Sequence, residues 1–241
     1  GLRIKSCAGD FALPVVQAFG STSEMGPCDL VFIALKTTAN ADLANLLPPL
    51  LHPGTVIVTL QNGLGNEAHL ASLHRADQVL GGVCFVCINR LAPGVIDHIS
   101  DGDVALGEFV GGPRPRTGQI SALLNACLIP SRVEPSLAVV RWKKLVWNIP
   151  FNGLGVASSA GLDSVLHGQV SAEAQLGPCL TTDKLLGDSS WEKLVRDLMQ
   201  EVILTAQAKG LKISGRLLET QIERTRPMGA YKAIGKKENR S

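Results

Sequence analysis

Aromatic residues and excess charge are both scarce in this chain of 241 residues, and each shortage excludes a class of function. Phe, Trp and Tyr make up 4% of the sequence, too few for the stacking surfaces on which proteins bind single-stranded nucleic acid. The formal net charge is only +2, so electrostatics favours neither nucleic acid nor an anionic membrane surface. We therefore expect no nucleic-acid partner.

Long hydrophobic runs are also missing. The best candidate for a membrane span, residues 43–60, is interrupted by Pro48, Pro49, His52 and Pro53, whereas a spanning helix needs about 20 consecutive apolar residues. The first residues, GLRIKSCAGD, contain no signal-peptide core. These absences predict a protein without a membrane partner.

Six cysteines are spread along the chain, but a framework of paired cysteines is absent. Cys84 and Cys87 have the CxxC spacing of some metal sites, yet no second CxxC exists. In a strand, residues three apart point to opposite faces, so we expect both cysteines to lie in the core and predict no metal site. Dispersed, reduced thiols are typical of a cytoplasmic protein.

What the sequence does contain is the pattern of an α/β protein. Hydrophobic residues make up 45% and charged residues 18%, the proportions of a globular protein with a substantial core. Short apolar runs, typical of strands buried on both faces, alternate with stretches of helical spacing. This order predicts a parallel sheet with crossover helices, preceded by an edge hairpin. The hairpin spans residues 2–16, the strands 28–36, 54–65 and 78–89, the helices 40–51 and 66–74, and two further short strands flank Asp101 and Gly102.

The second half of the chain has a different character. Residues 111–119 have the composition of a loop, and past Pro135 only helical patterns remain. The fold class is therefore an α/β domain over residues 1–133 followed by an all-helical domain over residues 134–241. The predicted helices lie over 136–149, within 162–187 and over 191–210, the last with Gly210 as its C-cap, and a frayed tail spans 232–241.

Polar residues follow two of the predicted strands at the point where each strand ends. Lys36 follows the first, and Asn62, with Gly63 and Gly65 beside it, follows the second. In open α/β sheets, ligands bind at the carboxyl ends of the strands. Taken singly, a lysine can simply end a strand in solvent, and Asn-Gly is an ordinary turn. Two such ends in one sheet lie close together, which favours a ligand site.

The segment RWKKLVWNIPFNG, residues 141–153, carries a lysine and two asparagines spaced four apart. In a helix, Lys144, Asn148 and Asn152 lie on one face. Their neighbours are apolar, so these polar groups need partners if they are buried. Pro150 adds to this need, because it frees the backbone carbonyl of Val146. The partners are either protein groups that orient the helix or a substrate, and the spacing alone favours neither.

Seven segments carry a resemblance to a known family. In order, they are LVFIALKTT, TLQNGLGNE, VLGGVCFV, GVIDHISDGDVALGE, KKLVWNIPFNGL, TTDKLL and ERTRPMGAYK. Together they resemble the ketopantoate reductases, or 2-dehydropantoate 2-reductases, over residues 1 to about 232. The Lys-x-x-x-Asn-x-x-x-Asn helix is the most specific element. The resemblance implies a Rossmann-like NADPH-binding domain over residues 1–133 and a helical substrate domain over residues 134–241.

The resemblance also implies an activity, the NADPH-dependent reduction of 2-dehydropantoate to pantoate in pantothenate biosynthesis. The substrate is a small 2-oxo acid, and a homodimer is allowed. In the family pattern the lysine at Lys144 donates the proton, and the asparagines at Asn148 and Asn152 hold the substrate. This agrees with the chemistry, because an ammonium group stabilises and protonates the oxygen of a ketone that receives a hydride. The implied cofactor contacts are at Lys36, Asn62 and Ile88.

The chain departs from the family pattern at both ends. The family begins with a glycine-rich strand–turn–helix that binds the cofactor pyrophosphate, and no such motif precedes GLRIKSC. Near the other end, the family serine for the substrate carboxylate aligns with AIGK, and Glu238 does not replace the glutamate that follows. We therefore expect an incomplete Rossmann-like domain and a truncated helical domain. Two alternatives stay open: a catalytically impaired remnant that acts as an interaction module, and a reductase for another 2-oxo acid.

Overall fold

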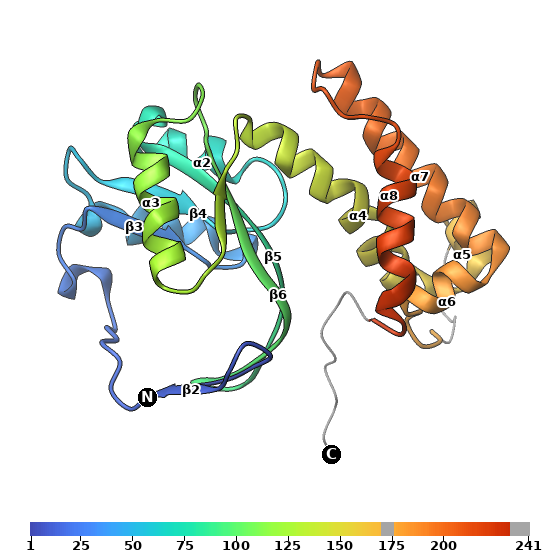
Figure 1. Ribbon diagram of the computed structural model, residues 1–241, viewed down its shortest axis with the longest axis horizontal. Helices are drawn as coiled ribbons and strands as arrows, with labels where there is room; N and C mark the ends of the chain where they lie inside the picture. Colours follow the sequence, from blue (N-terminus) through green and yellow to red (C-terminus); the bar gives the residue numbers. More distant parts are fainter. Residues whose placement is uncertain (170–175, 232–241) are drawn as a thin grey trace. The chain divides into compact units, whose positions relative to one another are not determined.

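The computed structural model describes residues 1–169 and 176–231, and the chain divides into two compact units (Figure 1). The first unit is Gly1–Arg141, and the second begins at Trp142. The boundary expected at residue 133 lies before helix α4 (Leu137–Ala157), whereas the first turns of that helix belong to the first unit. The expected frayed tail, 232–241, which includes AIGK and Glu238, lies outside the described residues.

A mixed seven-stranded sheet forms the first unit and confirms the predicted α/β class. Strands β3, β4 and the beginning of β5 run parallel, and β6 returns antiparallel along β5 as a long curved pair (Figure 1). The order across the sheet is β2-β1-β6-β5-β4-β3, with β7 beside β6. The expected N-terminal hairpin is confirmed by the antiparallel pairing of β1 with β2. The strands are β1 (Leu2–Ser6), β2 (Phe11–Leu13), β3 (Leu30–Ile33), β4 (Val56–Thr59), β5 (Val79–Ala92), β6 (Val95–Glu108) and β7 (Ser131–Val133).

Helical elements cover both faces of this sheet. Neighbouring residues of β4, Ile57 and Val58, point to opposite faces, and both are fully buried. Ile57 packs with side chains of α1 and α2, whereas Val58 packs with Ile120 of α3. The helical elements of the unit are η1 (Thr22–Glu24), η2 (Thr37–Asp42), α1 (Leu43–Leu46), η3 (Pro48–Leu50), α2 (Asn66–Leu73), η4 (Ala76–Gln78) and α3 (Pro115–Ala126).

The structure corrects the prediction that β3 is buried on both faces. Ile33 is buried, but its neighbour Phe32 is 38% exposed. β3 is the last strand in the sheet order. Phe32 lies on the face of β3 that carries Leu30, so this face is only partly covered.

The two short strands expected around Asp101 and Gly102 are one continuous strand, β6. A bulge accommodates the turn-forming residues: Asp101 has a φ of 61° and Gly102 a φ of 134°, and the register with β5 shifts at this point. His98 stabilises the bulge, because its Nε2 lies 2.8 Å from the carbonyl oxygen of Asp101 and its Nδ1 lies 2.9 Å from Ser6 Oγ. These two contacts give His98 a structural role in the sheet.

Part of the loop expected over 111–119 is helical, because α3 begins at Pro115. Proline suits the first helical position, since its fixed φ is helical and its missing N–H is not needed there. The expected loop therefore ends before Pro115, because this proline begins a helix.

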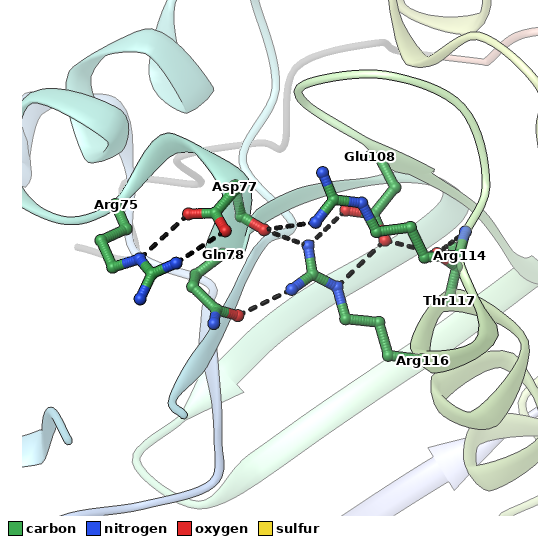
Figure 2. A network of polar contacts seen from close by, with 7 residues as sticks. All are labelled: Arg75, Asp77, Gln78, Glu108, Arg114, Arg116 and Thr117. Carbon is green, nitrogen blue, oxygen red and sulfur yellow. Dashed lines mark hydrogen bonds and ion pairs between the residues drawn. The ribbon is translucent and has the colours of Figure 1, made fainter. Parts of the chain in front are cut away.

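An ionic network fastens the start of α3 to the sheet (Figure 2). The side chain of Glu108, at the end of β6, is 1% exposed and receives hydrogen bonds from Arg116 Nε, at 3.1 Å, and from the hydroxyl of Thr117. Arg116 also donates to Gln78 Oε1, at 2.7 Å, and to the carbonyl oxygen of Asp77. The network therefore holds α3 against the segment that leads into β5.

The described part of the second unit is all helical, as predicted. Its longest helix after α4, α7, buries Val195, Met199 and Ile203 at helical spacing. α7 ends where expected, because Gly210 follows the C-cap residue with a φ of 78°. Among the described residues, no helix is both long and apolar enough to cross a membrane. The elements after α4 are η5 (Ser158–Ala160), α5 (Leu162–His167), α6 (Thr182–Gly187), α7 (Ser189–Ala208), α8 (Leu217–Thr225) and η6 (Arg226–Met228).

Candidate functional site

Lys36 and Asn62 follow β3 and β4 at the same edge of the sheet. The two strands are parallel neighbours, and their last residues, Ile33 and Thr59, are paired. Lys36 immediately precedes the 3₁₀ helix η2, and Asn62 lies in the loop between β4 and α2. Both residues are exposed. The topology thus places these two predicted site residues at the carboxyl ends of adjacent parallel strands.

Buried amide groups join the loop after β3 to the loop after β4. Gln61 Nε2 donates to Asn40 Oδ1 at 2.8 Å, and Gln61 Oε1 accepts from the Thr59 hydroxyl at 3.0 Å. Asn40 Nδ2 donates to Asn66 Oδ1 at 3.0 Å, and Asn66 Nδ2 donates to the carbonyl oxygen of Asn62 at 3.0 Å. Because buried amides are costly without partners, this chain of bonds fixes the backbone that presents Asn62.

The glycines beside Asn62 leave the loop open. Gly63 and Gly65 have φ values of 91° and 88°, a conformation that residues with a Cβ rarely adopt. No heavy atom lies within 4 Å of a Cβ built at either position. A ligand can therefore approach the main chain of this loop closely.

Glu67 and Arg141, which were not among the predicted site residues, form a buried ion pair beside the same loops. Their side chains are 7% and 5% exposed. Arg141 lies in the second turn of α4, and Glu67 lies in the first turn of α2. The one available signal was an arginine at the start of a largely apolar helix, LAVVRWKKLVW.

Ile88, the third expected cofactor contact, lies further along β5. It is 51% exposed and pairs with His98 of β6. Thr59 of β4 is opposite Gly81, so Ile88 lies seven residues beyond that point, roughly 23 Å of extended strand. Lys36 and Asn62 therefore lie at one edge of the sheet, whereas Ile88 lies far along β5 from that edge.

The polar stripe expected at residues 144–152 is present on α4. The helix continues through Pro150, so Lys144, Asn148 and Asn152 occupy one face on successive turns, roughly 6 Å apart along the axis. All three residues are half-buried. Asn152 Oδ1 is fully buried and has no hydrogen-bond partner among the described residues. An unpaired acceptor of this kind costs about 1–3 kcal/mol, which a ligand with a donor group can recover.

Trp147 orients α4 within the second unit. Its Nε1 donates to the hydroxyl of Thr225 at 2.8 Å, and its ring lies 5.0 Å from the ring of Phe151 and 6.1 Å from that of Tyr231. These contacts fix the rotation of the helix and, with it, the direction of the polar stripe. The sequence signal for this contact was the spacing of Trp147 and Phe151, two aromatic residues four apart in a chain with few aromatics.

Comparison with known proteins agrees with this architecture. Residues 1–111 match the family described as ketopantoate reductase PanE/ApbA. A 2-dehydropantoate 2-reductase from Nostoc sp. is 36% identical over 237 residues, which cover 96% of this chain and 68% of the relative. The crystal structure of a 2-dehydropantoate 2-reductase from Geobacter metallireducens is 39% identical, with a TM-score of 0.86, and the match covers 97% of this chain and 72% of that one.

A further crystal structure, of a 2-dehydropantoate 2-reductase from Methylococcus capsulatus, is 30% identical, with a TM-score of 0.78, over 96% of this chain and 69% of that one. Sequence and fold thus agree over nearly the whole chain with oxidoreductases of one kind. The resemblance inferred from the seven segments is confirmed. The chain belongs to the ketopantoate reductase PanE/ApbA family.

Proposed function

We propose that this protein reduces 2-dehydropantoate to pantoate with NADPH, as a step of pantothenate biosynthesis, and that Lys144 donates the proton. The observation that carries the proposal is the polar stripe of α4, with one cation and two amides on one helix face. It occurs in a chain whose relatives are named 2-dehydropantoate 2-reductases.

Lys144 supplies what the reduction of a ketone needs besides a hydride. When bound, NADPH would supply the hydride to the ketone carbon and be oxidised to NADP⁺, so that negative charge would develop on the ketone oxygen. The ammonium group of Lys144 stabilises the negative charge that develops on this oxygen and transfers a proton to it. The amine left on Lys144 then takes a proton from solvent, which completes the cycle.

Asn148 and Asn152 are proposed to bind the substrate. An amide both donates and accepts hydrogen bonds and carries no charge, so it can orient a polar substrate without repelling or trapping its carboxylate. The buried, unpartnered Oδ1 of Asn152 supports this role. This oxygen can accept a hydrogen bond, and the hydroxyl group of 2-dehydropantoate can donate one.

The cofactor is proposed to bind at the strand ends of the first unit, with contacts from Lys36, Asn62 and Ile88. Exposed polar side chains at the carboxyl ends of parallel strands support this site. The open backbone at Gly63 and Gly65 fits a ligand that approaches the main chain. NADPH rather than NADH is taken from the family resemblance, so both are to be compared.

Substrate-dependent oxidation of NADPH, followed by the absorbance of the reduced nicotinamide, tests the proposal. We expect turnover with 2-dehydropantoate that Lys144→Ala abolishes. The matched control is Lys143→Ala, which removes the adjacent, exposed lysine of the same helix and should retain turnover. Equal activity of the two variants would exclude Lys144 as the acid. No turnover of 2-dehydropantoate would exclude this substrate, and a panel of 2-oxo acids would then separate another reductase from a non-catalytic remnant.

A further inference from the structure

Arg141 holds the main chain at the end of β4. Its Nη1 donates to the carbonyl oxygen of Gln61 at 2.7 Å, and its Nη2 lies 3.5 Å from the carbonyl oxygen of Thr59. Its Nε donates to Glu67 Oε1 at 2.9 Å, and Nη2 contacts the same oxygen. One guanidinium group therefore joins three segments: helix α4, the start of α2, and the backbone that leads into Asn62.

Two glycines of the sheet leave the space that Glu67 and the start of α4 occupy. Gly81 of β5 and Gly107 of β6 lie opposite each other in the sheet. A Cβ at Gly81 would lie 2.4 Å from Glu67 Oε1, and one at Gly107 would lie 2.8 Å from Leu137 Cβ. Only a bare backbone at both positions lets the first turn of α4 and the Glu67 carboxylate come this close to the sheet.

A buried ion pair is a weak source of stability, because the cost of desolvating two charges offsets their attraction. A buried ion pair can instead fix the orientation of the groups that it joins. The planar guanidinium presents its donors in a fixed fork, so it can satisfy a carboxylate and main-chain carbonyls only in one orientation. The bonds to Gln61 and Glu67 thus favour a role in fixing geometry.

We propose that Arg141 is a positioning residue, which clamps the main chain at Gln61 and thereby fixes Asn62 in the conformation that binds the cofactor. The proposal rests on the proposed function, in which Asn62 contacts NADPH. Arg141 lies three residues before Lys144 in the same helix. The clamp therefore links the loop that presents Asn62 to the helix that carries the proton donor.

Arg141→Lys is the test substitution, because a lysine keeps the charge but cannot reach the carboxylate and the carbonyls at once. A looser loop spends less time in the binding conformation, and the apparent affinity falls in the same proportion. We expect the dissociation constant of NADPH to rise about tenfold, the usual effect of losing one charge-assisted hydrogen bond. Amide hydrogen exchange at residues 60–66 should become faster.

Arg116→Lys is the matched control (Figure 2). Arg116 also donates to a buried carboxylate, Glu108, and to a main-chain carbonyl. It lies on the opposite face of the sheet, because residues 80, 106 and 108 face α3, whereas Val83, Ala105 and Gly107 face α4. This control should lose similar stability, yet keep the wild-type affinity for NADPH and the wild-type exchange at residues 60–66.

The outcomes separate the clamp from the proposed function. Unchanged exchange at residues 60–66 in Arg141→Lys, or faster exchange with unchanged NADPH affinity, overturns the proposal. If the wild-type protein does not bind NADPH, the proposed function fails, and faster exchange in Arg141→Lys alone still establishes the clamp. Should Arg141→Lys not fold, Glu67→Gln repeats the test, since it keeps an acceptor for Nε but removes the charge that holds the guanidinium.

Discussion

Removal of the Arg141 guanidinium, with Glu67 left in place, should cost the first unit about 3–5 kcal/mol of unfolding free energy. The substitution is Arg141→Met, which keeps an apolar chain of similar reach and removes the charge. Glu67 would then be a carboxylate only 7% exposed, without a counter-ion. Its Oε1 lies against the sheet, so close that a Cβ at Gly81 would be 2.4 Å away.

Replacing both partners should recover most of this loss. In Arg141→Met combined with Glu67→Met, no charge remains buried, and apolar pairs of similar volume often replace buried ion pairs at no net cost. The double variant would still lack the bond to the Gln61 carbonyl. It should therefore be stable but keep fast amide exchange at residues 60–66.

Urea unfolding measured by two probes tests this cycle. All three tryptophans, Trp142, Trp147 and Trp191, lie in the second unit, so their fluorescence reports the unfolding of that unit. Far-UV circular dichroism reports both units, and its additional transition gives the stability of the first. Equal stability of the single and double variants would refute the reasoning, because it would mean that an unpaired Glu67 carries no penalty.

Two further predictions concern the second unit. Asn152→Leu should raise the unfolding free energy by about 1 kcal/mol, because it removes a buried acceptor without a partner; a clear loss of stability in urea would show that the Oδ1 is satisfied in the folded protein. Burial raises the pKa of the Glu192 carboxyl, but hydrogen bonds from Arg196 and Arg226 outweigh this, and the pKa lies below its usual value of 4.5. The stability from Glu192 is therefore present above that value and lost as the pH falls through the lowered pKa. Glu192→Gln should flatten the acid limb of thermal unfolding, and an unchanged limb would contradict the assignment.

The elements that the sequence predicted well are those with a local cause. Strand β4 was visible because both of its faces are covered, which gives the largely apolar run VIVT. The polar stripe of α4 was visible because helical spacing alone puts residues 144, 148 and 152 on one face. In both cases the signal lies within a few residues of the structure that it specifies.

The elements that the sequence did not reveal have distant causes. Arg141 and Glu67 are separated by 74 residues, and no local period links them. The glycines at 81 and 107 look like ordinary strand interruptions until the register places them opposite each other. The continuity of β6 through Asp101 likewise depends on its pairing with β5. Sequence patterns thus indicated the proposed ligand-binding residues, but not Arg141, which contacts the backbone beside one of them, or its partner Glu67.

Helix α4 belongs to the first unit up to Arg141 and to the second from Trp142 onward. Domain boundaries usually fall in exposed linkers, where changes of length are tolerated. Here the boundary falls inside a helix, where one inserted or deleted residue would turn the rest of α4 by about 100° around its axis and shift it by about 1.5 Å. The angle around the helix axis between Arg141 and Lys144 is therefore set by the pitch of a helix and by their separation of three positions in the chain.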